Sequence, residues 1–188
     1  KAMEMVAASK MRKSQAKAMA SRPYADKLDS ILRRMSQMID PSQHSLLVQS
    51  VPQEVNTIGL IVISPDKGLC GSLNTNIFKA LETTEKQLSH QHADIVLNFK
   101  YITVGKKARE YILKTGRTLH AEFTEIPDRP HFEAILPVTQ LLLGSFLNGD
   151  FYKVYLLYTN FVNTLTQKPE TVKLLPISAA ELELSTIN

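Results

Sequence analysis

The sequence contains one cysteine, Cys70, so no disulfide can form within the chain, and this scarcity is typical of a reducing compartment. No run of eighteen apolar residues occurs, so no transmembrane helix is expected. No secretory signal pattern is present, although residues preceding Lys1 would hide one. With 44% hydrophobic residues among 188, the chain can still bury a core of ordinary size and carry an appendage.

Nucleotide-binding signatures are also missing. The apolar run Thr57–Ile63 predicts a buried strand, and the turn 64–72 follows it where many α/β proteins bind phosphates. Gly71 precedes Ser-Leu rather than Lys-Ser or Lys-Thr, and no GxGxxG is present, so the phosphate-binding lysine of a P-loop is absent. We interpret Gly68 and Gly71 as a tight strand-to-helix turn; a second interpretation is an exposed, charged contact surface.

The titratable residues do not assemble into a recognisable active site. Cys70 has no sequence neighbour that could serve as its base, and a small packed thiol is the simpler interpretation. The histidines lack metal-ligand spacing. Asp66 and Asp128 follow predicted strands, where loop carboxylates are usually solvated. The sequence therefore predicts no catalytic residues, no cofactor and no metal site, and we do not expect the chain to be an enzyme.

Positive charge is concentrated in the first 39 residues. They contain nine Lys or Arg and three acidic residues, a net charge of +6, whereas the remaining thirteen Lys or Arg and fifteen acidic residues give −2. A basic segment of this kind suits an acidic protein surface, a nucleic acid or an anionic membrane. A solvated coiled-coil face is an equally good interpretation.

The same segment predicts a long helix with a coiled-coil seam. Strong helix formers dominate it, and small or apolar residues recur at alternating spacings of four and three. The seam positions are Ala7, Met11, Ser14, Ala18, Ser21, Ala25, Leu28, Leu32, Met35 and Ile39. Since the spacing continues through Pro23, we expect one kinked helix rather than a restart capped by Ser21. Because it opens on Lys1 without a cap, we expect a fragment of a longer helix.

Beyond this helix, predicted strands and helices alternate. Residues 1–40 are expected to form the helix, 41–56 a linker, 57–177 an α/β domain and 178–188 a tail. Strands are expected at 57–63, 101–104, 118–126, 152–159 and 171–177, with Pro169 in the loop before the last, and helices at 73–88, 106–113 and 130–147. This pattern predicts an α/β fold with a mostly parallel five-stranded sheet and flanking helices. The last two strands, with no helix between them, are expected to pair antiparallel.

Two motifs resemble the gamma subunit of the bacterial rotary (F-type) ATP synthase. They are Lys-Ala-Met-Glu-Met-Val-Ala-Ala-Ser-Lys-Met-Arg-Lys at 1–13 and Ser-Pro-Asp-Lys-Gly-Leu-Cys-Gly-Ser-Leu-Asn at 64–74. Ser-Arg-Pro-Tyr at 21–24 and Asn-Phe-Val-Asn-Thr-Leu-Thr-Gln at 160–167 also fit the family, in the same order and spacing. Family members begin earlier and end in a second long helix. We therefore expect this chain to be truncated at both ends, which leaves the seam without its partner.

The resemblance implies a mechanical role, that of the central-stalk rotor shaft in a proton-translocating ATP synthase. Such a shaft turns inside a ring of alpha and beta subunits and couples proton flow to ATP synthesis or hydrolysis in the catalytic beta subunits. The α/β domain would bear on the epsilon subunit and the membrane c-ring, as a peripheral protein on the cytoplasmic face of the bacterial inner membrane. The resemblance also implies that Met3, Lys10, Lys67 and Cys70 approach the mobile acidic lever of the beta subunit.

Two other functions stay open on the residues alone. A basic-helix nucleic-acid-binding protein would lose affinity as salt rises, which a binding series would reveal. A small Rossmann-like enzyme would need a nucleotide site, which a nucleotide titration would reveal.

Overall fold

The computed structural model describes residues 2–38, 40, 44–47, 56–124, 126–127 and 131–177. The chain divides into two compact units, one containing helix α1 (Ala2–Met38) and the other made of residues 44–177. The predicted tail, 178–188, and most of the predicted linker, 41–43 and 48–55, lie outside the described residues. The predicted boundaries of the four segments therefore stay predictions.

Helix α1 is one helix of 37 residues that runs through Pro23, as the uninterrupted seam predicted. Proline lacks the N–H that would continue the hydrogen-bond ladder, so one bond is missing at this point. The Ser21 hydroxyl does not cap a second helix; it donates to the carbonyl oxygen of Ala18 in the preceding turn, at 3.0 Å. The helix is thus continuous despite its proline.

The second half of the α1 seam carries exposed apolar side chains. Leu28, Leu32 and Met35 are between 42% and 49% exposed. Side chains of this size at coiled-coil spacing are normally covered by a second helix. The last seam position, Ile39, lies outside the described residues.

Residues 44–177 fold around a five-stranded sheet with the order β3-β2-β1-β4-β5. The strands are β1 (Thr57–Ile63), β2 (Asn98–Val104), β3 (Leu119–Phe123), β4 (Lys153–Phe161) and β5 (Gln167–Leu175). The first four strands are parallel, and β5 pairs antiparallel with β4. The predicted mostly parallel sheet with an antiparallel pair at one side is confirmed.

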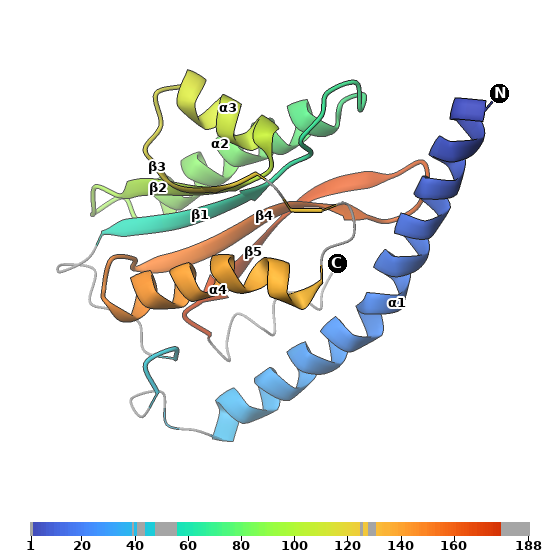
Figure 1. The fold of residues 1–188 in the computed structure, drawn as a ribbon. Helices are drawn as coiled ribbons and strands as arrows, with labels where there is room; N and C mark the ends of the chain where they lie inside the picture. The colour runs from blue at the N-terminus through green and yellow to red at the C-terminus, as the bar shows by residue number, and fades with distance from the viewer. Residues whose placement is uncertain are drawn as a thin grey trace. The chain divides into compact units, whose positions relative to one another are not determined.

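Three helices cover this sheet. They are α2 (Leu73–Gln91), α3 (Lys106–Lys114) and α4 (Phe132–Leu147). Figure 1 shows α2 and α3 on one face and α4 on the other. Because both faces are covered, β1 reads as a continuous apolar run rather than an alternating one. Among the described residues, no helix combines the length and the apolarity that crossing a membrane requires.

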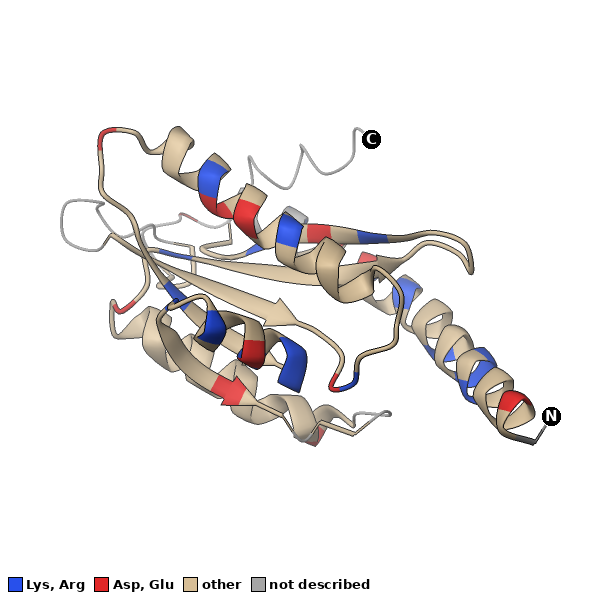
Figure 2. Cartoon of the chain, turned by 90° about the horizontal axis from the view of Figure 1, so that it is seen from above, with Lys and Arg blue, Asp and Glu red and all other residues tan. Residues whose placement is uncertain are grey.

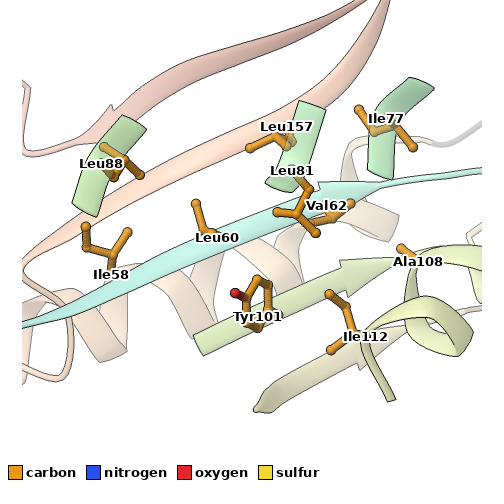
Figure 3. Close-up of a cluster of buried hydrophobic side chains, with 10 residues drawn as sticks. All are labelled: Ile58, Leu60, Val62, Ile77, Leu81, Leu88, Tyr101, Ala108, Ile112 and Leu157. Carbon is orange, nitrogen blue, oxygen red and sulfur yellow. The ribbon is translucent and has the colours of Figure 1, made fainter. Parts of the chain in front are cut away.

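Two apolar clusters join the layers. The first lies between the sheet and the α2–α3 layer, and Figure 3 shows its ten buried side chains, among them Leu60 of β1, Leu81 of α2 and Ile112 of α3. The second includes Ile61 of β1 and Phe146 of α4. Leu60 and Ile61 are adjacent in sequence but face opposite layers, as the two-residue period of a strand requires.

Some element boundaries differ from those predicted. β5 begins at Gln167 rather than 171, so Pro169 lies inside the strand and the prediction of a loop there was wrong. Proline removes a ladder donor, but β5 is an edge strand with one side unpaired, where proline is tolerated. β2 starts at Asn98, before the predicted 101, and β3 ends at Phe123, before the predicted 126. The predicted start of α4, Pro130, lies outside the described residues.

Candidate partner-contact surface

Helix α1 presents an exposed and basic surface. Between Ala2 and Met38 there are eight Lys or Arg and three acidic residues, and Figure 2 shows this excess along the helix. Near its start Met3 is 88% exposed, and Lys10 is also exposed. The helix thus combines apolar and cationic side chains that an acidic protein surface can bind.

The turn 64–72 leaves β1 at the carboxyl edge of the sheet and leads into α2. Its Lys67 is exposed, whereas Cys70 is partly buried. The Asn74 side-chain amide donates to the Cys70 Sγ at 3.2 Å. An amide is not a base, so this contact positions the thiol without activating it as a nucleophile. Lys67 and Cys70 therefore share one turn, while Met3 and Lys10 belong to the other compact unit.

The turn also caps helix α3. Gly105 precedes this helix and has no side chain to cap it, so the turn supplies the acceptors. Asp66 Oδ1 accepts from the Lys106 N–H at 2.8 Å, and Ser64 Oγ accepts from the Ala108 N–H at 2.7 Å. The Lys107 N–H donates to the Pro65 carbonyl oxygen at 3.3 Å. The first backbone amides of α3 are thus hydrogen-bonded within the protein itself.

This capping was missed by the sequence interpretation. Asp66 is exposed, as expected of a loop carboxylate, but it also accepts a hydrogen bond from the N–H at the start of α3, 40 residues later. A capping residue normally stands beside its helix in sequence, so no local signal could have indicated it. Asp128, the other carboxylate considered, lies outside the described residues.

Gly105 allows the turn and α3 to lie this close together. Its φ is +99°, and a Cβ built on it would lie 2.0 Å from the Ser64 carbonyl oxygen. Both the backbone conformation and the contact therefore require glycine. The close approach holds residues 64–66 against α3. Lys67, which is exposed, is the next residue after this anchored segment.

A separate polar cluster lies toward the amino ends of β2 and β3. Arg117 donates two hydrogen bonds to the Glu85 carboxylate, each 2.9 Å long, and Tyr101 donates to the same carboxylate. Burial, together with the hydrogen bond to Glu85, raises the pKa of Tyr101. The hydrogen bonds to Glu85 raise the pKa of Arg117. The cluster is internally satisfied, and it links α2 to the starts of the two strands.

In the described parts of the chain, no three His, Cys, Asp or Glu side chains come together in a way that could hold a metal ion.

Sequence comparisons relate this chain to ATP synthases. The ATP synthase family model matches residues 1–187. The ATP synthase gamma chains of Nitrosococcus oceani and Polaromonas sp. are 39% and 37% identical to this chain, over 179 and 183 residues. These alignments cover 95% and 97% of this chain but only 60% and 61% of the two relatives. The chain therefore spans about 60% of the length of these relatives.

The fold is also similar to that of a chain in a solved ATP synthase structure. A chain in the structure of the Tetrahymena thermophila mitochondrial ATP synthase central stalk and c-ring matches with a TM-score of 0.66 at 23% identity. The match covers 93% of this chain and 71% of that chain. At this identity the likeness shows the fold alone, but the family match along the sequence is nearly complete, as the motifs at 1–13 and 64–74 predicted. The chain belongs to the ATP synthase gamma chain family.

Proposed function

We propose that this chain is part of the central-stalk gamma subunit of a proton-translocating ATP synthase. In this role it is a non-catalytic rotor shaft that couples proton flow to ATP synthesis or hydrolysis in the catalytic beta subunits. The family match over residues 1–187 is the observation that carries the proposal. The 37-residue helix α1, with its exposed apolar seam, supports it because a shaft requires long paired helices.

The mechanism is one of differential contacts. A shaft that presents a different face to each beta subunit stabilises a different conformation in each, so the nucleotide sites differ in affinity. The basic surface of α1 suits such a shaft. Exposed ion pairs contribute only ~0–1 kcal/mol each, so contacts with successive acidic loops can form and break easily during rotation.

Four residues are proposed to contact the mobile acidic lever of the beta subunit: Met3, Lys10, Lys67 and Cys70. The exposure of Met3, Lys10 and Lys67 supports this assignment. The anchoring of residues 64–66 to α3 supports it further, because a contact loop held in one conformation loses less entropy on binding. Because Cys70 is partly buried, we propose that it contributes less contact area than the other three residues.

The proposed partners are the alpha and beta subunits of the catalytic head, the epsilon subunit and the membrane c-ring. The relatives named above are gamma chains of bacteria, and the Tetrahymena structure contains the central stalk with the c-ring. We accordingly propose a peripheral location on the cytoplasmic face of the bacterial inner membrane, with the membrane reached through the complex. No nucleic-acid partner is proposed.

The test uses the full-length subunit that contains this chain, expressed with the other subunits in membrane vesicles. We expect it to co-purify with the alpha and beta subunits, and we expect ATP-driven proton pumping to require it. Pumping that proceeds equally well without it would contradict the proposal. Binding to duplex DNA that weakens steeply with salt, in the absence of co-purification, would favour the nucleic-acid alternative instead.

A further inference from the structure

A lysine is almost fully buried at the amino edge of the sheet, which is the edge opposite to the turn 64–72. Lys153 is the first residue of β4, pairs with Ile58 of β1 and is 8% exposed. Lysine is rarely buried to this extent unless a carboxylate pairs with its ammonium group. No Asp or Glu among the described residues forms an ion pair with Lys153. Other groups must therefore stabilise its charge.

Two rings surround this ammonium group. The Lys153 Nζ lies 3.2 Å from Nε2 of His92 and 4.9 Å from the centre of the Tyr152 ring. The two rings meet at nearly a right angle, with their centres 5.8 Å apart. An aromatic face attracts a cation, and a neutral imidazole nitrogen can accept a hydrogen bond from it. The second interaction requires that His92 is neutral.

The contact with Lys153 defines the state of the His92 ring. An ammonium group carries donors only, so Lys153 donates and Nε2 of His92 accepts. The ring then carries its one proton on Nδ1. Burial lowers the pKa of His92 below its ordinary value of 6.5, and the charge of Lys153 lowers it further. The neutral ring that the hydrogen bond requires is therefore the form present at pH 7.

His92 also ends helix α2. It is the C-cap residue, and its backbone N–H donates to the Leu88 carbonyl oxygen at 3.2 Å. Leu88 is the last buried residue of the helix, and residues 89–91 are exposed. The ring of His92 therefore attaches this end of α2 to the start of β4, 61 residues later in the chain.

Protonation of His92 would reverse this attachment. Both ring nitrogens would then be donors, so Nε2 could no longer accept from Lys153. Two positive charges would also meet in a partly buried site, where like charges are poorly screened. A cation at the C-terminus of a helix is usually favourable, but here it would lie beside a second cation at 3.2 Å.

The remaining titratable groups around the pair come from β4, β5 and the end of α2. They are Tyr152, Tyr155, Lys173, His90 and Asp94. Burial raises the pKa of Tyr155 to about 12 and lowers that of Lys173 to about 8. Both groups therefore keep one charge state between pH 5 and 7. His90 and Asp94 are exposed, and neither is hydrogen-bonded to Lys153 in the described structure.

We propose that His92 and Lys153 form an acid-sensitive latch, which holds the end of α2 against the start of β4 at neutral pH and releases it when His92 is protonated. The inference goes beyond the proposed function and requires no other subunit. The turn 64–72 lies at the other end of α2, and its hydrogen bonds to α3 do not involve the latch. Acid should therefore loosen one edge of the α/β unit and leave the other intact.

The first test follows the histidine itself in the full-length subunit. Its ring resonance, identified by its loss in His92→Gln, is titrated by NMR with ¹³C-labelled histidine. We expect a midpoint below 6.5 in the parent, and we expect Lys153→Met to raise it because a neighbouring positive charge is removed. Lys168→Met, which changes an exposed lysine of β5, is the control and should leave the midpoint unchanged. Equal midpoints in the parent and Lys153→Met would overturn the pairing.

The second test measures opening of the helix end. Hydrogen exchange of the amides of residues 88–92 is compared at pH 5 and pH 7, after correction for the intrinsic exchange rates. Each unit by which the His92 midpoint lies below 6.5 permits up to about tenfold more frequent opening in acid. The parent should lose protection by the factor that its own titration gives. His92→Gln should retain it, because an amide oxygen can accept from Lys153 but does not titrate.

Three results of the exchange experiment would overturn the latch. Unchanged protection of residues 88–92 in the parent would show that protonation does not release the helix end. An equal loss in the parent and in His92→Gln would assign the acid sensitivity to another group, such as His120, whose pKa is also lowered by burial. An equal loss at residues 106–110, at the start of α3, would indicate general unfolding rather than a local release.

Discussion

The carboxylate of Asp66 accepts a hydrogen bond from the backbone N–H of Lys106, and this 2.8 Å contact joins the turn after β1 to the start of α3. Loss of a side-chain cap costs about 0.5–2 kcal/mol. We therefore expect Asp66→Ala to lower the free energy of unfolding by about 1 kcal/mol, measured by urea denaturation. Asp94→Ala, which removes an exposed carboxylate from the turn after α2, is the control and should have little effect. Equal effects of the two changes would contradict the capping role.

The partly buried pair of Arg117 and Glu85 should contribute more to stability than the exposed pair of Arg109 and Glu122. Their side chains are 17–19% and 41–42% exposed, respectively. Removing Arg117 takes two of three hydrogen bonds from the partly buried Glu85 carboxylate and leaves only the one from Tyr101, so Arg117→Ala should cost about 2 kcal/mol. Arg109→Ala should cost ~0–1 kcal/mol. Unfolding of the two variants compares them directly, and a larger loss at Arg109 would reverse our ranking.

Lys67→Glu should impair coupling more than stability. The side chain is exposed, so its loss from the isolated subunit should change the free energy of unfolding by only ~0–1 kcal/mol. Against an acidic lever the new carboxylate is repelled at one rotational position, and ATP turnover should slow most at low ionic strength, where screening is weakest. Turnover of mutant and parent enzymes is measured across salt, alongside melting of the subunit. Unchanged turnover at low salt would show that Lys67 does not face the lever.

The α/β unit should fold without α1. Its two apolar clusters lie within residues 44–177, and Leu46 contributes to the second one. The backbone N–H of Ile177 donates to the Leu46 carbonyl oxygen at 2.9 Å, which ties both ends of the unit together. We expect a protein of residues 44–177 to unfold cooperatively in denaturant, and one of residues 55–177 to be less stable. A gradual, non-cooperative transition in the longer protein would contradict this.

The stability should depend on pH through Lys173. Burial lowers the pKa of Lys173 from 10.5 to about 8, and the positive charge of Lys153 makes a smaller contribution in the same direction. Because the unfolded chain then binds more protons between these values, stability rises with pH across about 8 to 10.5, and the burial penalty is complete below 8. Relative to the parent, Lys173→Met should therefore lose stability as pH rises through this window. Exposed Lys168→Met is the control, and a pH-independent difference at Lys173 would contradict the shift.

Local patterns predicted the elements of this fold but not the contacts that fix its loops. The apolar run at 57–63 identified the central strand, and the absence of a helix after β4 identified the antiparallel pair. The role of Pro169 could not be predicted, because whether a proline is tolerated depends on the strand lying at an edge. The bond between Asp66 and Lys106, and the pairing of Glu85 with Arg117, join residues 40 and 32 positions apart. Such pairs become visible only when the sheet brings them together.

The residues proposed to contact the beta subunit illustrate the same limit. Met3, Lys10, Lys67 and Cys70 were chosen from motifs, which do not show how exposed a side chain is or which loops lie at one edge of the sheet. Only the register between β1 and β4 shows that the loop 162–166 emerges at the same edge as the turn that contains Lys67.

Both edges of the sheet are poorly suited to pairing with another sheet. β3 has only five residues, and β5 carries Pro169 between Lys168 and Glu170. Short edge strands, proline and charge all discourage strand addition from a second molecule. Strand addition would also change the stoichiometry. A rotor at the centre of a ring should be present as a single copy, and an exposed sheet edge could recruit a second copy of the chain. We therefore expect Pro169, inside the edge strand β5, to help keep the proposed shaft a single copy.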